Sequence, residues 1–195
     1  LEGTDVVVVR CGVGKVNAAL CVQILCDCYA VTHLVNTGIA GSPCAALDIG
    51  DLVVSTDVMY HDVDVTALGY PVGKVPGMDV LAFPADAMLR EYAFAVAEKI
   101  HPGHVRSGRV ASGDQFVASR GQKDVIIQHT GAVCTEMEGC AIAHTAYRNE
   151  IPFVIIRAIS DKADDSAQMD YPSFEAAAAV RCAAVITVLA EKMAI

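Results

Sequence analysis

Hydrophobic residues in this chain gather in short runs that alternate with longer segments of helical character. The clearest run, residues 151–159, is almost entirely apolar, as is typical of a strand covered on both faces. Further strands are predicted at 6–9, 32–36, 51–59, 105–111 and 132–134. Helices are predicted at 17–28, 84–100, 119–129, 136–147 and 174–192, the last with Ser173 as its N-cap. This alternation predicts an α/β fold with three layers, in which helices flank a mixed, mostly parallel central sheet.

Length and charge limit the possible partners. The 195 residues suit one domain, 1–195, and no apolar run reaches the roughly 18 residues of a membrane-spanning helix. The chain has 23 acidic against 14 basic residues, a net charge of −9, which argues against a nucleic-acid surface. We therefore expect neither a membrane nor a nucleic acid as partner.

The eight cysteines do not form a metal or disulfide pattern. Cys26 and Cys28 are too closely spaced for a zinc hook, and together with Cys21, Cys140 and Cys182 they lie in apolar, helix-like stretches. We expect reduced thiols in a cytoplasmic protein. The six histidines include no helical pair at metal-ligand spacing, so we expect no metal and no cofactor.

Residues 60–83 do not fit the alternation of strands and helices. They hold three glycines and two prolines, yet several apolar side chains are spread between them. Loops of this length are uncommon in compact domains and tend to be functional. We expect the apolar side chains of this loop to pack against another surface, either a pocket of its own chain or a neighbouring subunit.

Three short segments that contain glycine follow predicted strands. Gly12-Val-Gly-Lys15 is not a phosphate-binding loop, because that motif needs glycine where Val9 stands and Ser or Thr where Val16 stands. It does not match the dinucleotide-binding motif either, because Asn17 stands in place of the third glycine. We predict a tight strand-to-helix turn near a pocket.

The segment 37–41 follows a predicted strand and is small enough for backbone to approach a ligand, although an ordinary turn explains it equally well. The segment 112–117 also follows a strand. Its Phe116 could stack on a planar ring. Taken alone, burial in the core is the favoured interpretation of Phe116.

Two carboxylates are out of place in this pattern. Asp161 directly follows the strand 151–159, at the carboxyl end where α/β sheets bind their ligands. Glu138 lies among small and apolar residues, where a carboxylate is costly unless it is paired or in use.

Both carboxylates also have simpler explanations. Asp161 could cap a helix or form a turn, because Asp164 and Asp165 follow it in a polar loop, and Glu138 could pair with Arg157. Taken together with the glycine-rich strand ends, the two acids predict one shared site for a polar ligand.

Five motifs lie in order over essentially the whole chain: Cys11-Gly-Val-Gly-Lys15, Asn36-Thr-Gly-Ile-Ala-Gly41, Tyr60-His-Asp-Val-Asp-Val-Thr-Ala67, Glu136-Met-Glu-Gly-Cys-Ala-Ile-Ala-His144 and Pro152-Phe-Val-Ile-Ile-Arg-Ala-Ile-Ser-Asp161-Lys-Ala-Asp164. Together they resemble the bacterial 5′-methylthioadenosine/S-adenosylhomocysteine nucleosidases, which have the nucleoside phosphorylase fold. The family implies hydrolysis of the N-glycosidic bond of adenine thio-nucleosides, and of 5′-deoxyadenosine, to adenine and the thioribose product.

The resemblance implies roles for residues in the last two motifs. Asp161 would donate a proton towards adenine N7, and Ser160 would orient it. Glu138 would accept hydrogen bonds from the ribose hydroxyls, which strengthen as the sugar gains oxocarbenium character. Met137 would pack against the ribose.

Phe116 would stack on the adenine, and the Val117 backbone would read its edge. The remaining substrate-binding positions implied by the resemblance are Val13, Ala40, Gly41, Glu136 and Arg157. From the apolar loop, Val65, Leu68 and Pro76 match positions that line the alkylthio pocket of a partner subunit, which implies a homodimer. Leu68 replaces an aromatic residue of the family, so the pocket should stay apolar with an altered shape.

Phosphorylases of this fold hold phosphate with cationic and hydroxyl groups. Asn36 and Ile39 stand where such relatives carry Arg and Ser, which favours water as the nucleophile, although Ile39 also departs from the Ser usual in the nucleosidases. Two alternatives remain, a purine nucleoside phosphorylase and a binding or storage relative with impaired catalysis.

The amino terminus differs from the family pattern. Family members begin with another strand, followed by a Glu that activates the water, whereas Leu1 follows that region. We expect the family's first strand to be missing from 1–195 and the sequence to be a fragment, and no residue here takes the role of that Glu.

Overall fold

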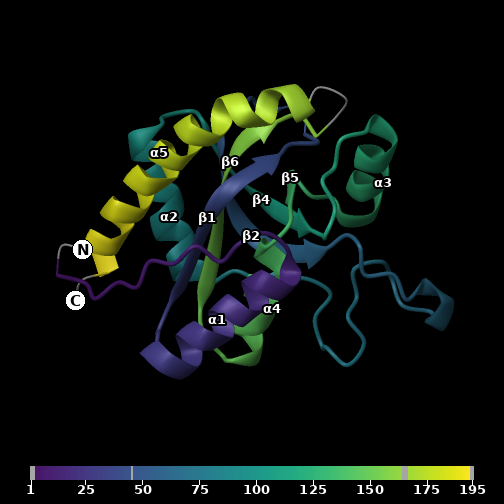
Figure 1. Cartoon of the computed structure of the whole chain (residues 1–195), viewed down its shortest axis with the longest axis horizontal. Coiled ribbons are helices and arrows are strands. Elements are labelled where there is room, and N and C mark those ends of the chain that lie inside the picture. Colours follow the sequence, from purple (N-terminus) through teal and green to yellow (C-terminus); the bar gives the residue numbers. More distant parts are fainter. Residues whose placement is uncertain (1–2, 45, 164–166, 194–195) are drawn as a thin grey trace.

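The structure is a computed structural model that describes residues 3–44, 46–163 and 167–193 (Figure 1). Helices cover a small sheet of six strands. In chain order the elements are α1 (Lys15–Tyr29), β1 (Leu34–Gly41), β2 (Leu52–Tyr60), the 3-10 helix η1 (Thr66–Leu68), β3 (Phe83–Pro84), α2 (Ala87–Ile100), β4 (Val105–Ser112), α3 (Arg120–Thr130), β5 (Cys134–Glu136), α4 (Gly139–Arg148), β6 (Phe153–Asp161) and α5 (Ala167–Met193).

Five of the strands close into a barrel. Their order is β2-β4-β5-β1-β6, and β6 pairs back with β2, while β3 is added at the outer side of β2. Three of the pairings are parallel (β1 with β6, β2 with β4, β4 with β5), and three are antiparallel (β1 with β5, β2 with β3, β2 with β6). The prediction of three layers around a mostly parallel central sheet is therefore wrong.

A bend in β2 accounts for the closure. The first residues of β2, Leu52–Val54, run antiparallel to Ile156–Ala158 of β6. The register between β2 and β4 then shifts between Ser55 and Val58. Irregularities of this kind bend a strand and increase its twist. The periodicity of the sequence predicts where strands lie, but it carries no information about such closure.

The glycine-rich segment 37–41 belongs to a strand and is not a turn. It forms the second half of β1, parallel to β6, with Gly38 opposite Arg157. A Cβ atom at Gly38 would lie only 2.6 Å from Arg157 Nη1, so glycine makes room for that side chain. The predicted strand 32–36 therefore extends to Gly41.

The predicted strand at residues 6–9 is absent from the described structure. The side chains of Val6–Val9 are 40% to 81% exposed, and this segment has no regular secondary structure. β-branched residues supply strand propensity, but a strand also needs a hydrogen-bonding neighbour. The turn 12–14 consequently leads into α1 without a preceding strand.

Most other elements lie within about three residues of their predicted positions. Ser119 caps α3 as expected, because its side chain accepts a hydrogen bond from the Gln122 N–H. Two helix starts differ: Asp86 caps α2, and α5 begins at Ala167, so Ser173 lies inside that helix and is not its cap. Asp164 and Asp165 lie outside the described residues.

Two groups of helices cover the barrel (Figure 1). Helices α1 and α4 pack against each other on one side, and α2 packs against α5 on the other. Each pair buries its own apolar cluster against the strands, the first around Val22 and Ile142 and the second around Leu89 and Val185. Within the described residues, no helix is long and apolar enough to span a membrane.

Candidate active site

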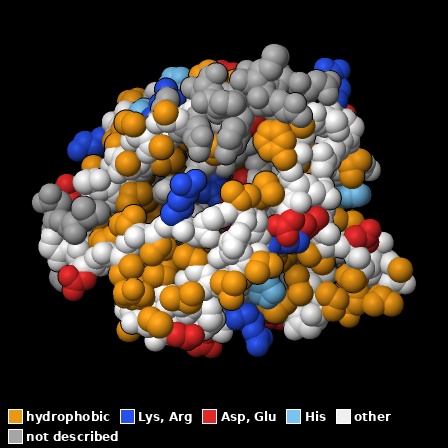
Figure 2. Space-filling model, in the orientation of Figure 1, with side chains coloured by type: hydrophobic (Ala, Val, Ile, Leu, Met, Phe, Trp, Pro, Cys, Tyr) orange, Lys and Arg blue, Asp and Glu red, His pale blue; other side chains and the backbone are white. Residues whose placement is uncertain are grey.

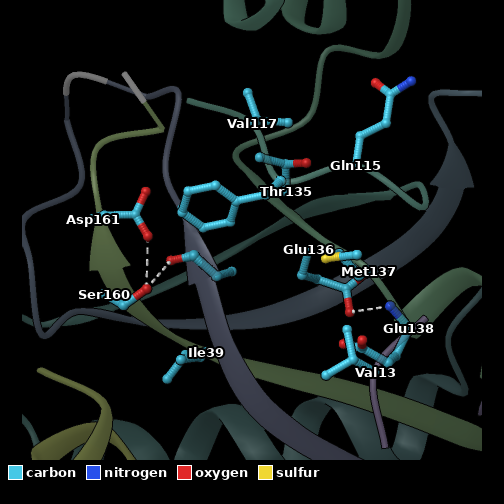
Figure 3. A pocket seen from close by; sticks show the side chains of 13 residues that line it. Val13, Ile39, Gln115, Val117, Thr135, Glu136, Met137, Glu138, Ser160 and Asp161 are labelled. Carbon is cyan, nitrogen blue, oxygen red and sulfur yellow. Dashed lines mark hydrogen bonds between the residues drawn. The ribbon is translucent and has the colours of Figure 1, made fainter. Parts of the chain in front are cut away.

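A cavity of about 220 Å³ opens where the ends of β1, β5 and β6 meet, between the turn before α1 and the loop after β4 (Figure 3). Ten of the predicted site residues line it: Val13, Ala40, Gly41, Phe116, Val117, Glu136, Met137, Glu138, Ser160 and Asp161. Asp161 and Glu138 lie on opposite sides of this cavity in Figure 3. The structure therefore brings the two out-of-place carboxylates into one site.

Asp161 is held firmly at the end of β6. It is 2% exposed, and the Ala163 N–H donates to its Oδ1 over 2.8 Å. The Ser160 hydroxyl donates to its Oδ2 over 2.8 Å and also lies 3.3 Å from the Ala40 carbonyl oxygen. A Cβ atom at Gly41 would lie 2.6 Å from Asp161 Oδ1, so the carboxylate depends on glycine at this position.

Glu136 and Arg157 form a buried ion pair next to the cavity. Arg157 Nη2 lies 2.5 Å from Glu136 Oε2, and both side chains are almost completely buried. Arg157 is also bonded to Asn36 Oδ1, over 2.5 Å. Arg157 does not line the cavity, and its partner is Glu136, not Glu138 as the simpler explanation of the sequence supposed.

The pKa of Glu136 reflects these contacts. Burial alone would raise the pKa of its carboxyl, but the Arg157 guanidinium and several hydrogen bonds hold that pKa below its ordinary value. The donors are the Ser112 hydroxyl, the Glu138 N–H and the Gly139 N–H. Glu136 is therefore a fixed buried anion.

Glu138 stands at the N-cap position of α4, and the turn 12–14 reaches it. Its Oε1 accepts a hydrogen bond of 2.8 Å from the Gly14 N–H. Gly14 has φ of 91°, a conformation that favours glycine. Burial, and next the negative charge of Glu136, raise the pKa of the Glu138 carboxyl. This side chain therefore accepts hydrogen bonds but holds its charge less readily than an exposed Glu.

The loop after β4 supplies an aromatic wall. Phe116 lines the cavity and is 46% exposed, so the interpretation of Phe116 as a core residue is wrong. Its neighbour Val117 is buried. An exposed ring at a cavity can stack on a planar ligand.

Three further residues line the cavity that the sequence did not mark as binding residues: Ile39, Gln115 and Thr135. Each is next in the chain to a predicted residue, and that proximity is the only signal that could have found them. The loop residues Val65, Leu68 and Pro76 are not among those that line it. The described residues include no group of three His, Cys, Asp or Glu side chains that could hold a metal ion.

Comparison with known proteins places these features in context. The family model described as "Phosphorylase superfamily" matches residues 1–191. A 5′-methylthioadenosine/S-adenosylhomocysteine nucleosidase from an Exiguobacterium species is 38% identical over 194 residues, which are 99% of this chain and 83% of that protein.

Solved structures of similar proteins agree with the sequence comparison. The nucleosidase of the same name from Neisseria meningitidis, in complex with methylthio-immucillin-A, superposes with a TM-score of 0.90 at 39% identity and covers 93% of this chain and 79% of that one. The nucleosidase from Streptococcus pneumoniae, in a structure with a transition-state inhibitor, superposes with a TM-score of 0.89 at 35% identity. That comparison covers 94% of this chain and 79% of the other.

Proposed function

We propose that this chain, which belongs to the 5′-methylthioadenosine/S-adenosylhomocysteine nucleosidases of the phosphorylase superfamily, hydrolyses the N-glycosidic bond of both nucleosides and of 5′-deoxyadenosine. The products are adenine and a 5-thioribose derivative, or adenine and 5-deoxyribose when 5′-deoxyadenosine is the substrate. The observation that carries the proposal is the single cavity with Asp161 and Glu138 on opposite sides. A nucleoside has a base at one end and ribose hydroxyls at the other, and the two carboxylates suit these two ends.

At the base end, Asp161 acts as the general acid. The adenine anion is a poor leaving group, so a proton delivered to N7 lets the glycosidic bond break early. The hydrogen bonds from Ser160 and from the Ala163 N–H fix the orientation of the carboxyl group. Phe116 stacks on the purine, and the Val117 backbone reads the purine edge. Ala40 and Gly41 form the wall beside Asp161.

At the sugar end, Glu138 accepts the ribose hydroxyls. These hydrogen bonds strengthen as positive charge develops on the sugar, so they stabilise the transition state more than the bound substrate. Met137 and Val13 pack against the ribose. Glu136 and Arg157 lie just behind and hold the segment 136–138 in place.

Water, and not phosphate, is the proposed nucleophile. A phosphate site needs unpaired cationic or N–H donors. Here Asn36 is bonded to Arg157, whose guanidinium already pairs with Glu136, and the apolar Ile39 lines the cavity. Running the reaction on methylthioadenosine with and without phosphate tests this: equal rates support hydrolysis, and phosphate-dependent formation of 5-methylthioribose 1-phosphate would make the protein a phosphorylase.

The reaction itself is tested by incubating the protein with methylthioadenosine and measuring the adenine released. Release supports the proposal. Tight binding of methylthioadenosine without release would instead show a binding or storage relative.

We further propose a cytoplasmic location, which the free thiol state of all eight cysteines supports.

We also propose a homodimer in which each subunit completes the other's pocket. Leu68 is 74% exposed at the end of η1, on the loop that projects beyond β2 in Figure 1. Helix α1 exposes Val16, Leu20 and Ile24, and Figure 2 shows apolar side chains gathered over this region and over the projecting loop. Val65, Leu68 and Pro76 would cover the alkylthio group in the second subunit.

A complementation experiment tests the shared pocket. Leu68→Asp should weaken methylthioadenosine binding, and Asp161→Asn should prevent turnover. In a heterodimer of the two variants, one site has an intact Asp161 and an intact Leu68, so co-expression should restore activity above that of either variant alone. Activity no greater than the sum of the two separate variants would contradict a shared pocket.

A further inference from the structure

A polar cluster lies behind Glu138, outside the cavity lining, and it joins three segments far apart in the sequence. We call Lys15, Asp62 and Asp114 the lysine cluster. Lys15 Nζ lies 2.7 Å from Asp62 Oδ2 and 3.8 Å from Asp114 Oδ2. The Asp114 N–H also donates to Asp62 Oδ2, over 2.9 Å. The start of α1 is thereby tied to the segments that follow β2 and β4.

The lysine cluster adjoins the hydrogen bond that reaches Glu138. Two consecutive backbone N–H groups at the start of α1 donate to carboxylates: Gly14 to Glu138 Oε1 and Lys15 to Asp114 Oδ1, each over 2.8 Å. A Cβ atom at Gly14 would lie 3.1 Å from Asp114 Oδ1. The Gly14 peptide is thus held between Asp114 on one side and Glu138 on the other.

The lysine cluster lies next to a segment that has no strand partner to fix the turn. Residues 5–12 have no regular secondary structure, and the side chains of Val6–Val9 are exposed. The Lys15–Asp62 pair is well sheltered, with side chains 26% and 11% exposed, so the pair is screened less by solvent than a surface ion pair. A charged pair of this kind can fix a turn that its own upstream segment does not.

We propose that the residues of the lysine cluster are positioning residues, which hold the Gly14 N–H against Glu138 and so fix the carboxylate that receives the ribose hydroxyls. This inference rests on the proposed function. It implies that Lys15 acts on the sugar end of the site and leaves the adenine end unchanged. The lysine cluster itself contacts no substrate.

The first test compares a nucleoside with its free base. In Lys15→Met we expect the Kd for a non-hydrolysed analogue, methylthio-immucillin-A, to rise about tenfold, the size expected for one hydrogen bond to a charged group. The Kd for adenine, which has no ribose, should stay within twofold of wild type. Lys15→Arg keeps the charge and should recover most of the affinity, and Lys99→Met, on the exposed side of α2, is the matched control.

The second test is a double-mutant cycle with Glu138→Gln. If Lys15 acts through Glu138, then Lys15→Met should add no further loss of analogue affinity in the Glu138→Gln background. If the two substitutions weaken analogue binding independently, so that their fold-changes in Kd multiply, the inference is overturned. An equal loss of affinity for adenine and for the analogue would also overturn it. If Lys15→Met does not fold, Asp62→Asn takes its place in the same cycle.

These readouts separate the inference from the proposed function. Binding of the analogue and of adenine is measured without turnover, so a protein that releases no adenine still tests the lysine cluster. Conversely, suppose that the wild-type protein releases adenine normally, but the variants lose affinity for adenine and for the analogue equally. That result would contradict only the positioning role.

Discussion

Ser160 hydrogen-bonds to the carboxylate of Asp161 over 2.8 Å, although the two are consecutive residues of β6. Consecutive side chains of a regular strand point to opposite faces. Along β1, Ala40 lies opposite Ile159 and Gly41 lies opposite Asp161, so Ser160 is an extra residue in the ladder. Such a bulge re-aims side chains, and here it lets Ser160 support the proposed acid.

Asp161→Asn removes the proposed proton donor while keeping the shape of the side chain. We expect adenine release to fall by about 10²- to 10⁴-fold, the range for loss of a general acid, with methylthio-immucillin-A still bound. Asp124→Asn, exposed on α3, is the control. A variant with near-normal release would refute the role of Asp161.

Gly41→Ala tests the close approach between β1 and the acid. The new methyl group would lie 2.6 Å from Asp161 Oδ1 and 3.0 Å from Ala163 Cβ, so the carboxyl group must move. We expect kcat to fall at least about tenfold, because small misplacement of a catalytic group is costly. Gly121→Ala, where nothing lies within 4 Å of the added atom, should leave kcat unchanged. Equal kcat in both variants would show that Asp161 tolerates the shift.

The raised pKa of Glu138 predicts the acid side of the pH profile. Burial and the neighbouring Glu136 charge raise this pKa above 4.5, so as pH falls the carboxylate is protonated earlier than an exposed Glu. The affinity for methylthio-immucillin-A should therefore begin to fall at a pH above that ordinary value. Glu138→Gln should bind more weakly and lose this step in a plot of log Kd against pH. If Glu138→Gln shows a step of the same size, the step belongs to another titrating group.

Arg157→Met tests the buried ion pair. Without the guanidinium, the Glu136 carboxylate stays buried next to Glu138 with its main counter-charge removed. We expect the free energy of unfolding in urea to fall by about 3–5 kcal/mol. The double variant Glu136→Gln, Arg157→Met should recover part of this loss, because the uncompensated charge is gone. A double variant less stable than Arg157→Met would show that hydrogen bonds, and not charge, dominate at Glu136.

The same pair predicts a pH effect on stability. The folded state lowers the pKa of Glu136, so the pair stabilises the protein above the unfolded-state pKa. That contribution is lost as pH falls through the lower folded-state value. In Glu136→Gln the stability should depend less on pH over this acidic window, measured as the urea midpoint at each pH; an unchanged dependence would contradict the ion-pair role.

Local patterns in the sequence determined much of the secondary structure and pointed to the site. The apolar run 151–159 predicts β6, and its polar end marks Asp161. The position of Glu138 among small and apolar residues predicts a carboxylate in use, and Glu138 lines the same cavity as Asp161. The strand prediction is confirmed because burial and strand periodicity are properties of neighbouring residues.

Only the tertiary structure decided which segments meet. In the tertiary structure, the pairing of β2 with β6 closes the barrel, and residues 6–9 form no strand. Arg157 pairs with Glu136, which lies 21 positions away in the chain. The fold also places the lysine cluster behind Glu138. Pairing between distant segments depends on bends, bulges and the space that each glycine leaves, and no periodicity along the chain records these.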